Sequence, residues 1–201
     1  MAKVLCFLSA CVLLACSLAA GGTKTLASDP KCFGPPSAPV TIDLYSDYQC
    51  PACRALYLGT ITPLMADCVS TGKVYLVEHD FPLSMHAHAK EAAEYANAAA
   101  KIHKFETVSN ELFQKQAIWA ADGSIDAVVA AVLTPAEMVK LRAALKDPGI
   151  DQSIANDVAL GTKAGLRQTP TMIISRDGKT YPMSGIISYP ILKRFLDDLA
   201  K

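Results

Sequence analysis

Two cysteines separated by two residues are the part of this sequence best suited to chemistry, in the run Cys50-Pro51-Ala52-Cys53. Thiol-disulfide exchange needs one thiolate to attack a sulfur and a second thiol to resolve the mixed disulfide, and this spacing supplies both. Pro51 suits the first turn of a helix, because its missing N–H costs nothing there. We therefore expect a helix to begin at this pair.

The two thiols are expected to differ in acidity. At the N-terminal end of a helix, unpaired N–H groups and the helix dipole favour an anion, and cysteine pKa values fall to roughly 3.5–7.5. Cys50 would occupy that end and act as the nucleophile. Cys53 lies one turn deeper and would wait as the shielded resolving thiol. A stabilised Cys50 thiolate favours the reduced form, which makes the disulfide form a stronger oxidant.

Other uses of the paired cysteines are weaker. A Cys-x-x-Cys pair is also half of a zinc site, but Cys32 and Cys68, which would complete it, lack the usual paired spacing. His86 and His88 stand at i and i+2, so they do not share a helix face as metal ligands would. A purely structural disulfide is the other alternative, although a strand-to-helix turn is where reactive dithiols lie. We predict no bound metal.

The N-terminal residues 1–20 resemble an export signal. Lys3 is followed by a short apolar run and then by Ser17-Leu18-Ala19, which is typical of a cleaved secretory signal. The apolar run is too short for a comfortable transmembrane helix. An uncleaved N-terminal anchor and a lipoprotein signal with its lipid on Cys16 are the alternatives. We therefore expect an exported protein of the periplasm or another extracytoplasmic compartment.

Export changes how the cysteines are interpreted. The chain has seven cysteines, of which the predicted signal contains Cys6, Cys11 and Cys16. The four that remain are an even number, which in an oxidising compartment suggests two disulfides. If Cys50 pairs with Cys53, Cys32 is left to pair with Cys68. That bond would close a loop of about 36 residues and stabilise the fold by roughly 3–4 kcal/mol on the chain-entropy model. The alternative is two buried free thiols.

The order of the predicted elements indicates an α/β fold. A Gly-, Ser-, Thr- and Pro-rich stretch at 21–38 is expected to be a flexible leader. A strand at 40–45, a helix at 51–70 bent by Gly59 and Pro63, and a strand at 73–78 form a crossover unit with parallel strands. Further helices are predicted at 87–104, 106–116, 125–133, 135–146 and 150–164. Strands at 171–175 and 179–183, joined through Asp177-Gly178, form a hairpin before a last helix at 189–200.

These elements fit one domain at 39–201, with a mixed sheet and an all-helical insertion at about 86–164. The chain has 201 residues, is 51% apolar and 19% charged, and carries a formal net charge of zero. This composition predicts a folded chain. Without a basic patch, nucleic acid is not an expected partner.

Three motifs resemble the DsbA-like thiol-disulfide oxidoreductases of the thioredoxin superfamily. The run from Val40 to Cys53 is similar to their active-site strand and helix. His79-Asp80-Phe81-Pro82-Leu83 resembles their second strand, and Gly165-Leu166-Arg167-Gln168-Thr169-Pro170-Thr171 resembles their cis-proline loop. The resemblance covers about residues 38–200 and implies a thioredoxin-like fold with a helical insertion.

The resemblance also implies roles for residues far from the cysteines. Pro170 would follow a cis bond, and the Thr169 backbone would lie beside the Cys50 sulfur to pair with an extended substrate chain. Many relatives carry a buried acid six positions before the first cysteine, where this chain has Leu44. Glu78 on the second strand is a possible substitute for it. Ala52 replaces a histidine found in some strong oxidants and can add neither charge nor a hydrogen bond.

The function expected from the residues and the resemblance is oxidation of dithiols in unfolded or reduced exported proteins. Re-oxidation would need a membrane redox partner, and no bound cofactor is required because the cysteine pair is the redox centre. We expect a monomer. A disulfide reductase or isomerase is the first alternative, although no stretch before Val40 is long enough for the separate dimerisation region usual in isomerases. A non-catalytic thiol module that binds a metal is the second.

Overall fold

The computed structural model describes residues 30–199. The predicted signal at 1–20, with Cys6, Cys11 and Cys16, lies outside the described residues. Within the described range no helix is both long enough and apolar enough to cross a membrane.

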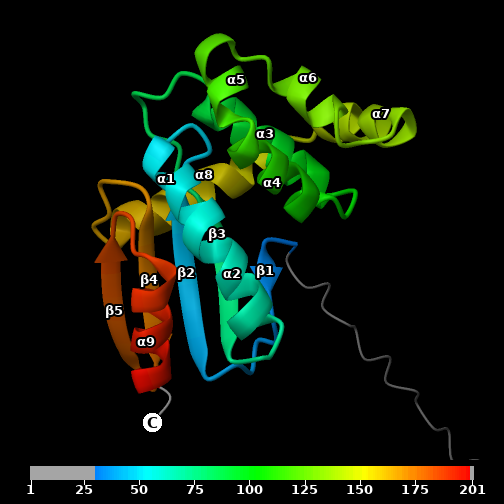
Figure 1. Cartoon of the computed structure of the whole chain (residues 1–201). Helices are drawn as coiled ribbons and strands as arrows, with labels where there is room; N and C mark the ends of the chain where they lie inside the picture. The colour runs from blue at the N-terminus through cyan, green and yellow to red at the C-terminus, as the bar shows by residue number, and fades with distance from the viewer. Residues whose placement is uncertain (1–29, 200–201) are drawn as a thin grey trace, which may run out of the picture.

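A five-stranded mixed sheet forms the centre of the fold, in the order β1-β3-β2-β4-β5 (Figure 1). The strands are β1 (Cys32–Phe33), β2 (Val40–Ser46), β3 (Val74–Asp80), β4 (Thr171–Arg176) and β5 (Lys179–Ser184). The pair β2 and β3 is parallel, as the crossover unit predicts, and β4 is antiparallel to both β2 and β5. The hairpin turn uses the left-handed backbone of Asp177 and Gly178, as the Asp-Gly pair predicts.

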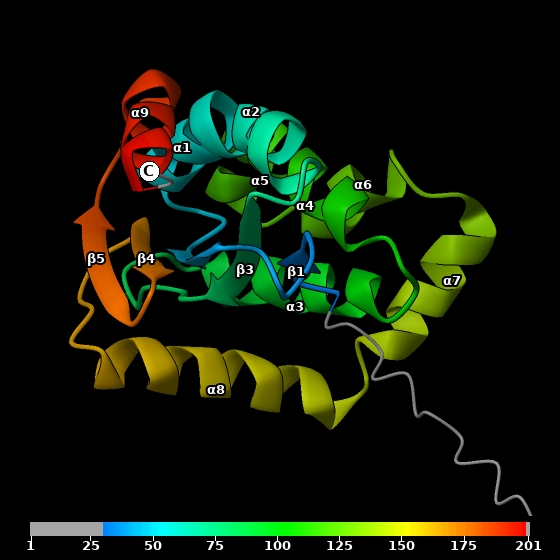
Figure 2. The ribbon, with the colours of Figure 1, turned by 90° about the horizontal axis from the view of Figure 1, so that it is seen from below.

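Alternation along β2 and β3 gives the sheet two different faces. Val40, Ile42 and Leu44 are buried on one face of β2, whereas Asp43 lies on the other face, where it bonds to His79 of β3. Successive side chains of a strand point to opposite faces, so this division follows directly from the sequence. The first face carries the active-site helix, and the second is covered by α8 (Pro148–Lys163) (Figure 2).

The helix predicted at 51–70 is continuous but contains wider turns. Its segments are α1 (Pro51–Leu56), the π-helical η1 (Tyr57–Ile61), α2 (Thr62–Leu64) and the π-helical η2 (Met65–Val69). Pro63 has no N–H, and its ring would clash with the carbonyl of Gly59 in an ordinary helix. A π turn just before it, closed by the Thr62 N–H on the Tyr57 carbonyl, absorbs the proline without ending the helix.

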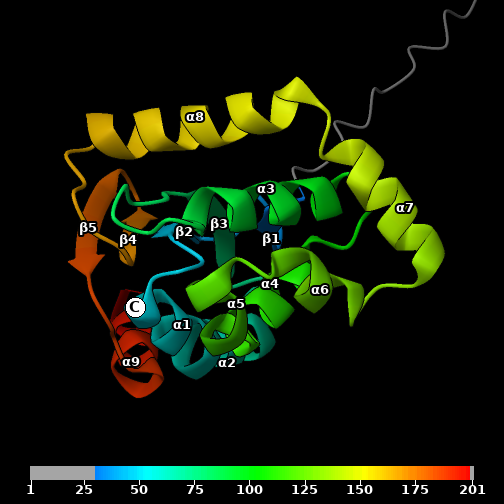
Figure 3. The same ribbon diagram turned by 90° about the horizontal axis from the view of Figure 1, so that it is seen from above.

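The helical insertion lies between β3 and β4. It consists of α3 (Ala89–Ala100), α4 (Phe105–Gln114), α5 (Gln116–Asp122), α6 (Ile125–Ala130), α7 (Pro135–Ala144) and α8. The alanines of α3 let α4, α6, α7 and α8 pack closely around it (Figure 3). The sequence did not predict α5 as a separate helix. Its Trp119 is fully buried and donates its indole N–H to the Leu112 carbonyl at 2.8 Å.

Helices on both faces complete a layered arrangement. The segment α1–η2 and the last helix, α9 (Tyr189–Leu199), cover one face of the sheet, and α8 covers the opposite face (Figure 2). Gly161 lets α8 approach the sheet, because a Cβ there would lie 2.7 Å from the Phe81 ring and 3.0 Å from the Tyr45 ring.

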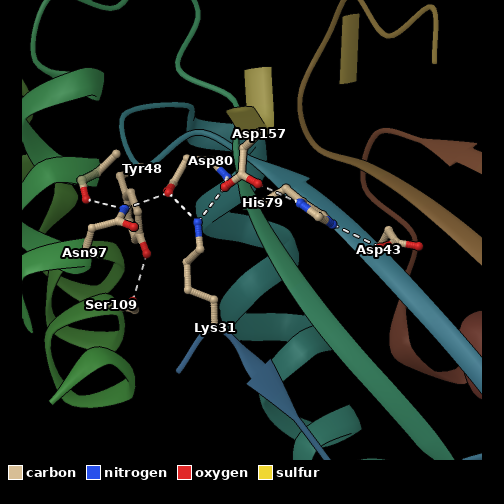
Figure 4. A network of polar contacts seen from close by, with 9 residues as sticks. Lys31, Asp43, Tyr48, His79, Asp80, Asn97, Ser109 and Asp157 are labelled. Carbon is tan, nitrogen blue, oxygen red and sulfur yellow. Dashed lines mark hydrogen bonds and ion pairs between the residues drawn. The ribbon is translucent and has the colours of Figure 1, made fainter. Parts of the chain in front are cut away.

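The predicted leader at 21–38 is not loose where the structure describes it. Strand β1 pairs with β3, and Lys31 is 5% exposed. The Lys31 ammonium contacts Asp80 at 3.0 Å and also contacts Asp157 of α8 (Figure 4). These buried ion pairs fix the chain to the sheet, so the folded domain begins earlier than the predicted residue 39.

The same network continues across the sheet through His79 (Figure 4). Its two ring nitrogens lie 2.9 Å from carboxylate oxygens of Asp43 and Asp157, an arrangement that suits the doubly protonated ring. Burial alone would lower the pKa of His79, but the hydrogen bonds to Asp157 and Asp43 outweigh it and raise that pKa to about 9. The Tyr45 ring stacks on the imidazole with centroids 4.6 Å apart.

The predicted Cys32–Cys68 disulfide is not formed in the structure. Cys32 lies on β1, at one edge of the sheet. Cys68 is buried in η2. It lies near Tyr189 of α9, whose pKa is raised first by burial, then by the hydrogen bond to Asp67 and then by Cys68.

Candidate active site

Cys50 and Cys53 lie where the link after β2 enters α1. Cys50 is the N-cap residue, with an extended backbone at φ −72° and ψ 121°, and Pro51 occupies the first turn. Cys50 is 7% exposed, whereas Cys53 is 1% exposed. The outer thiol can therefore meet a partner sulfur that the inner thiol cannot reach.

The environment shifts the two thiol pKa values in opposite directions. A hydrogen bond from the Cys53 thiol, the backbone N–H groups of Cys53 and Ala52, and the Thr169 side chain together outweigh burial and lower the pKa of Cys50 to about 5. Burial, and then the neighbouring Cys50 sulfur, raise the pKa of Cys53 well above its ordinary value. At neutral pH the reduced pair therefore holds a thiolate on Cys50 and a proton on Cys53.

The loop before β4 brings Thr169 and Pro170 to the same sulfur. The Thr169–Pro170 peptide bond is cis, and the Cys50 sulfur lies 3.5 Å from the Thr169 carbonyl oxygen. The Thr169 hydroxyl is buried and makes no hydrogen bond to another oxygen or nitrogen in the described residues. It lies near both sulfurs, where it lowers the pKa of Cys50 and opposes the rise in the pKa of Cys53.

Asp47 is a site residue that our sequence analysis did not single out. Its side chain is fully buried. One carboxylate oxygen accepts from the N–H groups of Gln49 at 2.7 Å and Cys50 at 3.1 Å, and the other accepts from the Leu83 N–H and the His86 ring. The Asp47 N–H donates to the Cys53 sulfur at 3.4 Å. Aspartate side chains commonly accept hydrogen bonds from the backbone N–H groups two and three residues ahead in turns. The run Asp47-x-Gln49-Cys50 could therefore have predicted this turn.

Two glutamines attach the active-site turn to the helical insertion. Gln116 of α5 donates to the carbonyl oxygens of Tyr48 and Cys50 at 2.6 and 3.0 Å. Gln49 donates to the Ala120 carbonyl and accepts from the His88 N–H at the start of α3. The insertion therefore holds the turn that presents Cys50. Nothing in the local sequence of Gln116 indicates this contact.

The remaining predicted site residues are placed as follows. Leu44 is buried on β2, and Glu78 stands opposite it on β3 in the strand register. In the described part of the chain no hydrogen bond joins Glu78 to either active-site sulfur, so its role in proton transfer stays a prediction. Burial, followed by the nearby charge of Asp80, raises the pKa of Glu78 to about 8. Ala52 packs against the core and contributes its backbone N–H to Cys50.

Thiol-disulfide oxidoreductases catalyse exchange with a pair of thiols whose pKa values are shifted in opposite directions. The sheet that carries the pair in this protein has a thioredoxin-like mixed arrangement. The protein is therefore a disulfide oxidoreductase by class. A family model described as thioredoxin matches residues 27–198, and the chain belongs to that family. Within the thioredoxin superfamily it is similar to the DsbA proteins, as the solved structures below show.

Solved structures similar to this chain include two DsbA proteins and a protein named BdbD. The α-DsbA1 of Wolbachia pipientis has 22% identity and a TM-score of 0.72, with 84% of this chain and 89% of that chain covered. DsbA2 of Pseudomonas aeruginosa has 26% identity and a TM-score of 0.63, with coverage of 88% and 97%. Oxidised BdbD of Bacillus subtilis has 20% identity and a TM-score of 0.68, with coverage of 84% and 91%. No curated protein sequence matches the chain.

Proposed function

We propose that this protein is a dithiol oxidase, which passes the Cys50–Cys53 disulfide to reduced or unfolded exported proteins. The observation that carries the proposal is the lowered pKa of Cys50, at about 5, directly outside a buried Cys53. A stabilised thiolate favours the reduced enzyme, so the disulfide form gives up its bond readily to other thiols.

The reaction has two exchange steps. A substrate thiolate attacks the Cys50 sulfur of the enzyme disulfide, an enzyme–substrate disulfide forms, and Cys53 leaves and takes up a proton. A second substrate thiolate then attacks the substrate sulfur of this mixed disulfide and releases Cys50 as a thiolate. The substrate loses two electrons and gains a disulfide, and the enzyme is left as a dithiol.

The neighbours of Cys50 suit these steps. The low pKa makes Cys50 the better leaving group in the second step, because the more stable thiolate leaves faster. The carbonyl oxygen of Thr169, 3.5 Å from the Cys50 sulfur, supplies an acceptor for the N–H of an extended substrate chain. No bound cofactor is needed in this scheme, since the cysteine pair carries the electrons.

Export and re-oxidation complete the proposal. The N-terminal residue pattern favours a periplasmic or other extracytoplasmic enzyme, held by lipid on Cys16 or by an uncleaved anchor in the alternative cases. Each turnover leaves a dithiol, so a membrane redox partner must return the enzyme to the disulfide form. We propose that the protein acts as a monomer.

A reductase or isomerase is the second candidate. It is favoured by Leu44, which replaces the buried acid of many relatives, and by Thr169 before the proline, which is shared with some isomerases. The two directions are separated by comparing rates on one enzyme preparation. An oxidase oxidises reduced ribonuclease A faster than its dithiol form reduces insulin disulfides, and a reductase shows the opposite order.

The oxidase proposal is tested with the chain from residue 21 onward in its disulfide form. It should convert two thiols of reduced ribonuclease A for each Cys50–Cys53 disulfide consumed. Cys53→Ser, with Cys50 first blocked as a disulfide to thionitrobenzoate, should react with reduced ribonuclease A. A substrate thiolate attacks the Cys50 sulfur and displaces thionitrobenzoate, and the enzyme–substrate disulfide should accumulate as a larger species that disappears with reductant. Full oxidation by a Cys50→Ser variant would overturn the mechanism.

A further inference from the structure

A cavity of about 890 Å³ lies on the side of the active-site helix that faces the insertion. It is bounded by the segment from Tyr57 to Ser70, by α4 and by the residues around β1, and α4 contacts η1. Its apolar wall includes Phe33, Tyr57, Ile61, Met65 and Val132. This volume lies within the range of small-molecule sites in proteins.

The side chain of Glu78 contributes to this cavity from the sheet. The residue is 8% exposed, and within residues 30–199 nothing donates a hydrogen bond to its carboxyl group and no basic side chain pairs with it. A buried carboxyl group without a partner costs free energy, so such groups in proteins normally face a water, an ion or a ligand. The Glu78 carboxyl group is therefore placed to bind a water, an ion or a ligand in the cavity.

The remaining lining makes the cavity acidic. Glu106 and Glu111 of α4 also border it, and neither forms an ion pair in the described part of the chain. The described lining residues include no lysine, arginine or histidine. Burial raises the pKa of Tyr57, and the charges of Glu78 and Glu106 raise it further, so both carboxyl groups lie near this ring. A cation would meet unpaired carboxyl groups and aromatic faces there.

We propose that this cavity binds an organic cation, with one ammonium or guanidinium group at Glu78 and a short apolar body against Tyr57, Ile61 and Met65. Either a free amine or the end of a basic side chain has this chemistry. The site goes beyond the proposed oxidase function, because its ligand contacts neither sulfur and its occupancy does not depend on thiol chemistry.

Protonation of Glu78 gives the binding a signature. Its pKa of about 8 reflects burial first and then Asp80, with Lys31 opposing. A bound cation favours the ionised carboxylate and so releases a proton. The other ionisable groups that act on Glu78 or feel its charge are Glu106, His79, Tyr48 and Tyr57.

The test uses butylguanidinium and its uncharged analogue butylurea, followed by methyl NMR shifts of Ile61, Met65 and Val132. Butylguanidinium should shift these signals saturably, and butylurea should bind about tenfold more weakly or not at all. Calorimetry in two buffers of different ionisation enthalpy should show proton release with butylguanidinium. A blocked peptide with one arginine, compared with the same peptide containing citrulline, tests whether a polypeptide side chain can enter.

Variants connect the binding to the cavity. Glu78→Gln should weaken butylguanidinium about tenfold, while Glu91→Gln, a surface change on α3, should leave the affinity unchanged. Val132→Trp should block binding by filling the cavity wall if Glu78→Gln proves hard to fold. Cys50→Ser should bind normally, so a failed oxidase proposal leaves the site unaffected. Equal binding of butylguanidinium and butylurea, unchanged affinity in Glu78→Gln, or no methyl shifts would overturn the inference.

Discussion

The sulfur of Cys50 lies 3.5 Å from the carbonyl oxygen of Thr169, although 119 positions separate these residues in the chain. The contact joins the start of α1 to the loop before β4. It places the nucleophile, the buried Thr169 hydroxyl and the acceptor for a substrate chain at one point. The contribution of this contact to the stability of the Cys50 thiolate can therefore be tested by substitutions on either side of it.

Replacing Thr169 by valine should raise the pKa of Cys50 while leaving the fold intact. In the reduced wild-type protein, the ultraviolet absorbance of the thiolate should titrate with a midpoint near pH 5. Thr169→Val removes a hydroxyl that supports the thiolate, so the midpoint should rise by about 0.5–1 unit. The unfolding free energy should change by less than about 0.5 kcal/mol, because the hydroxyl has no other hydrogen bond to lose.

Thr169→Ser keeps the hydroxyl and is the matched control, for which the midpoint should stay close to that of wild type. An unchanged midpoint in Thr169→Val would show that the backbone N–H groups and Cys53 alone stabilise the thiolate.

Removing the Asp47 carboxylate should destabilise the protein and disturb Cys50. Asp47→Ala removes the side-chain acceptor of four donors, although the Cys50 N–H keeps the Asp47 carbonyl as an acceptor. The loss should cost about 2–4 kcal/mol of unfolding free energy in urea titrations. The turn that presents Cys50 is then no longer fixed. The rate of Cys50 alkylation by iodoacetamide should therefore fall, or should depend less sharply on pH. His86→Ala removes only one of the four donors and should cost clearly less. Wild-type stability in Asp47→Ala would refute this role.

The His79 ion pairs should make stability fall at alkaline pH. The pKa of His79 is about 9 in the fold and about 6.5 in the unfolded chain. The contribution is fully present below the unfolded value, and it is lost as pH rises through the folded value. At about 1.4 kcal/mol for each unit of pKa, the shift of about 2.5 units corresponds to about 3.5 kcal/mol.

Urea titrations of wild type and His79→Gln at about pH 6, 8 and 10 measure this term. Both proteins should carry Cys50→Ser and Cys53→Ser, so that thiol ionisation does not contribute. The difference between their unfolding free energies should shrink as pH rises. A difference that stays constant over this range would mean that His79 is neutral in the fold.

The sequence indicates the elements that carry the site better than the contacts that tune it. The Cys50–Cys53 spacing, the Asp-Gly turn at 177–178 and the alternation along 40–45 are local signals, and the elements that they predict are present. The family resemblance, and not periodicity, pointed to Thr169 and Pro170, because the loop reaches Cys50 only through the sheet.

Other features depend on distant partners that no local pattern encodes. Gln116 contacts the active-site turn from a helix, α5, that was not predicted. Cys32 lies on β1 and Cys68 in η2, and counting cysteines suggested a disulfide between them that is not formed in the structure. Lys31 is buried because Asp80 and Asp157 surround it. The composition of residues 21–38 predicts a flexible leader, in which Lys31 would be exposed to solvent.

The reduction potential of the Cys50–Cys53 pair tests the oxidase account most directly. The chain from residue 21 onward is equilibrated with glutathione buffers, and its thiols are alkylated and counted by mass. We predict a potential well above that of thioredoxin, which is about −270 mV, because the stabilised Cys50 thiolate favours the dithiol. A potential near or below that value would contradict it and assign the protein to disulfide reduction.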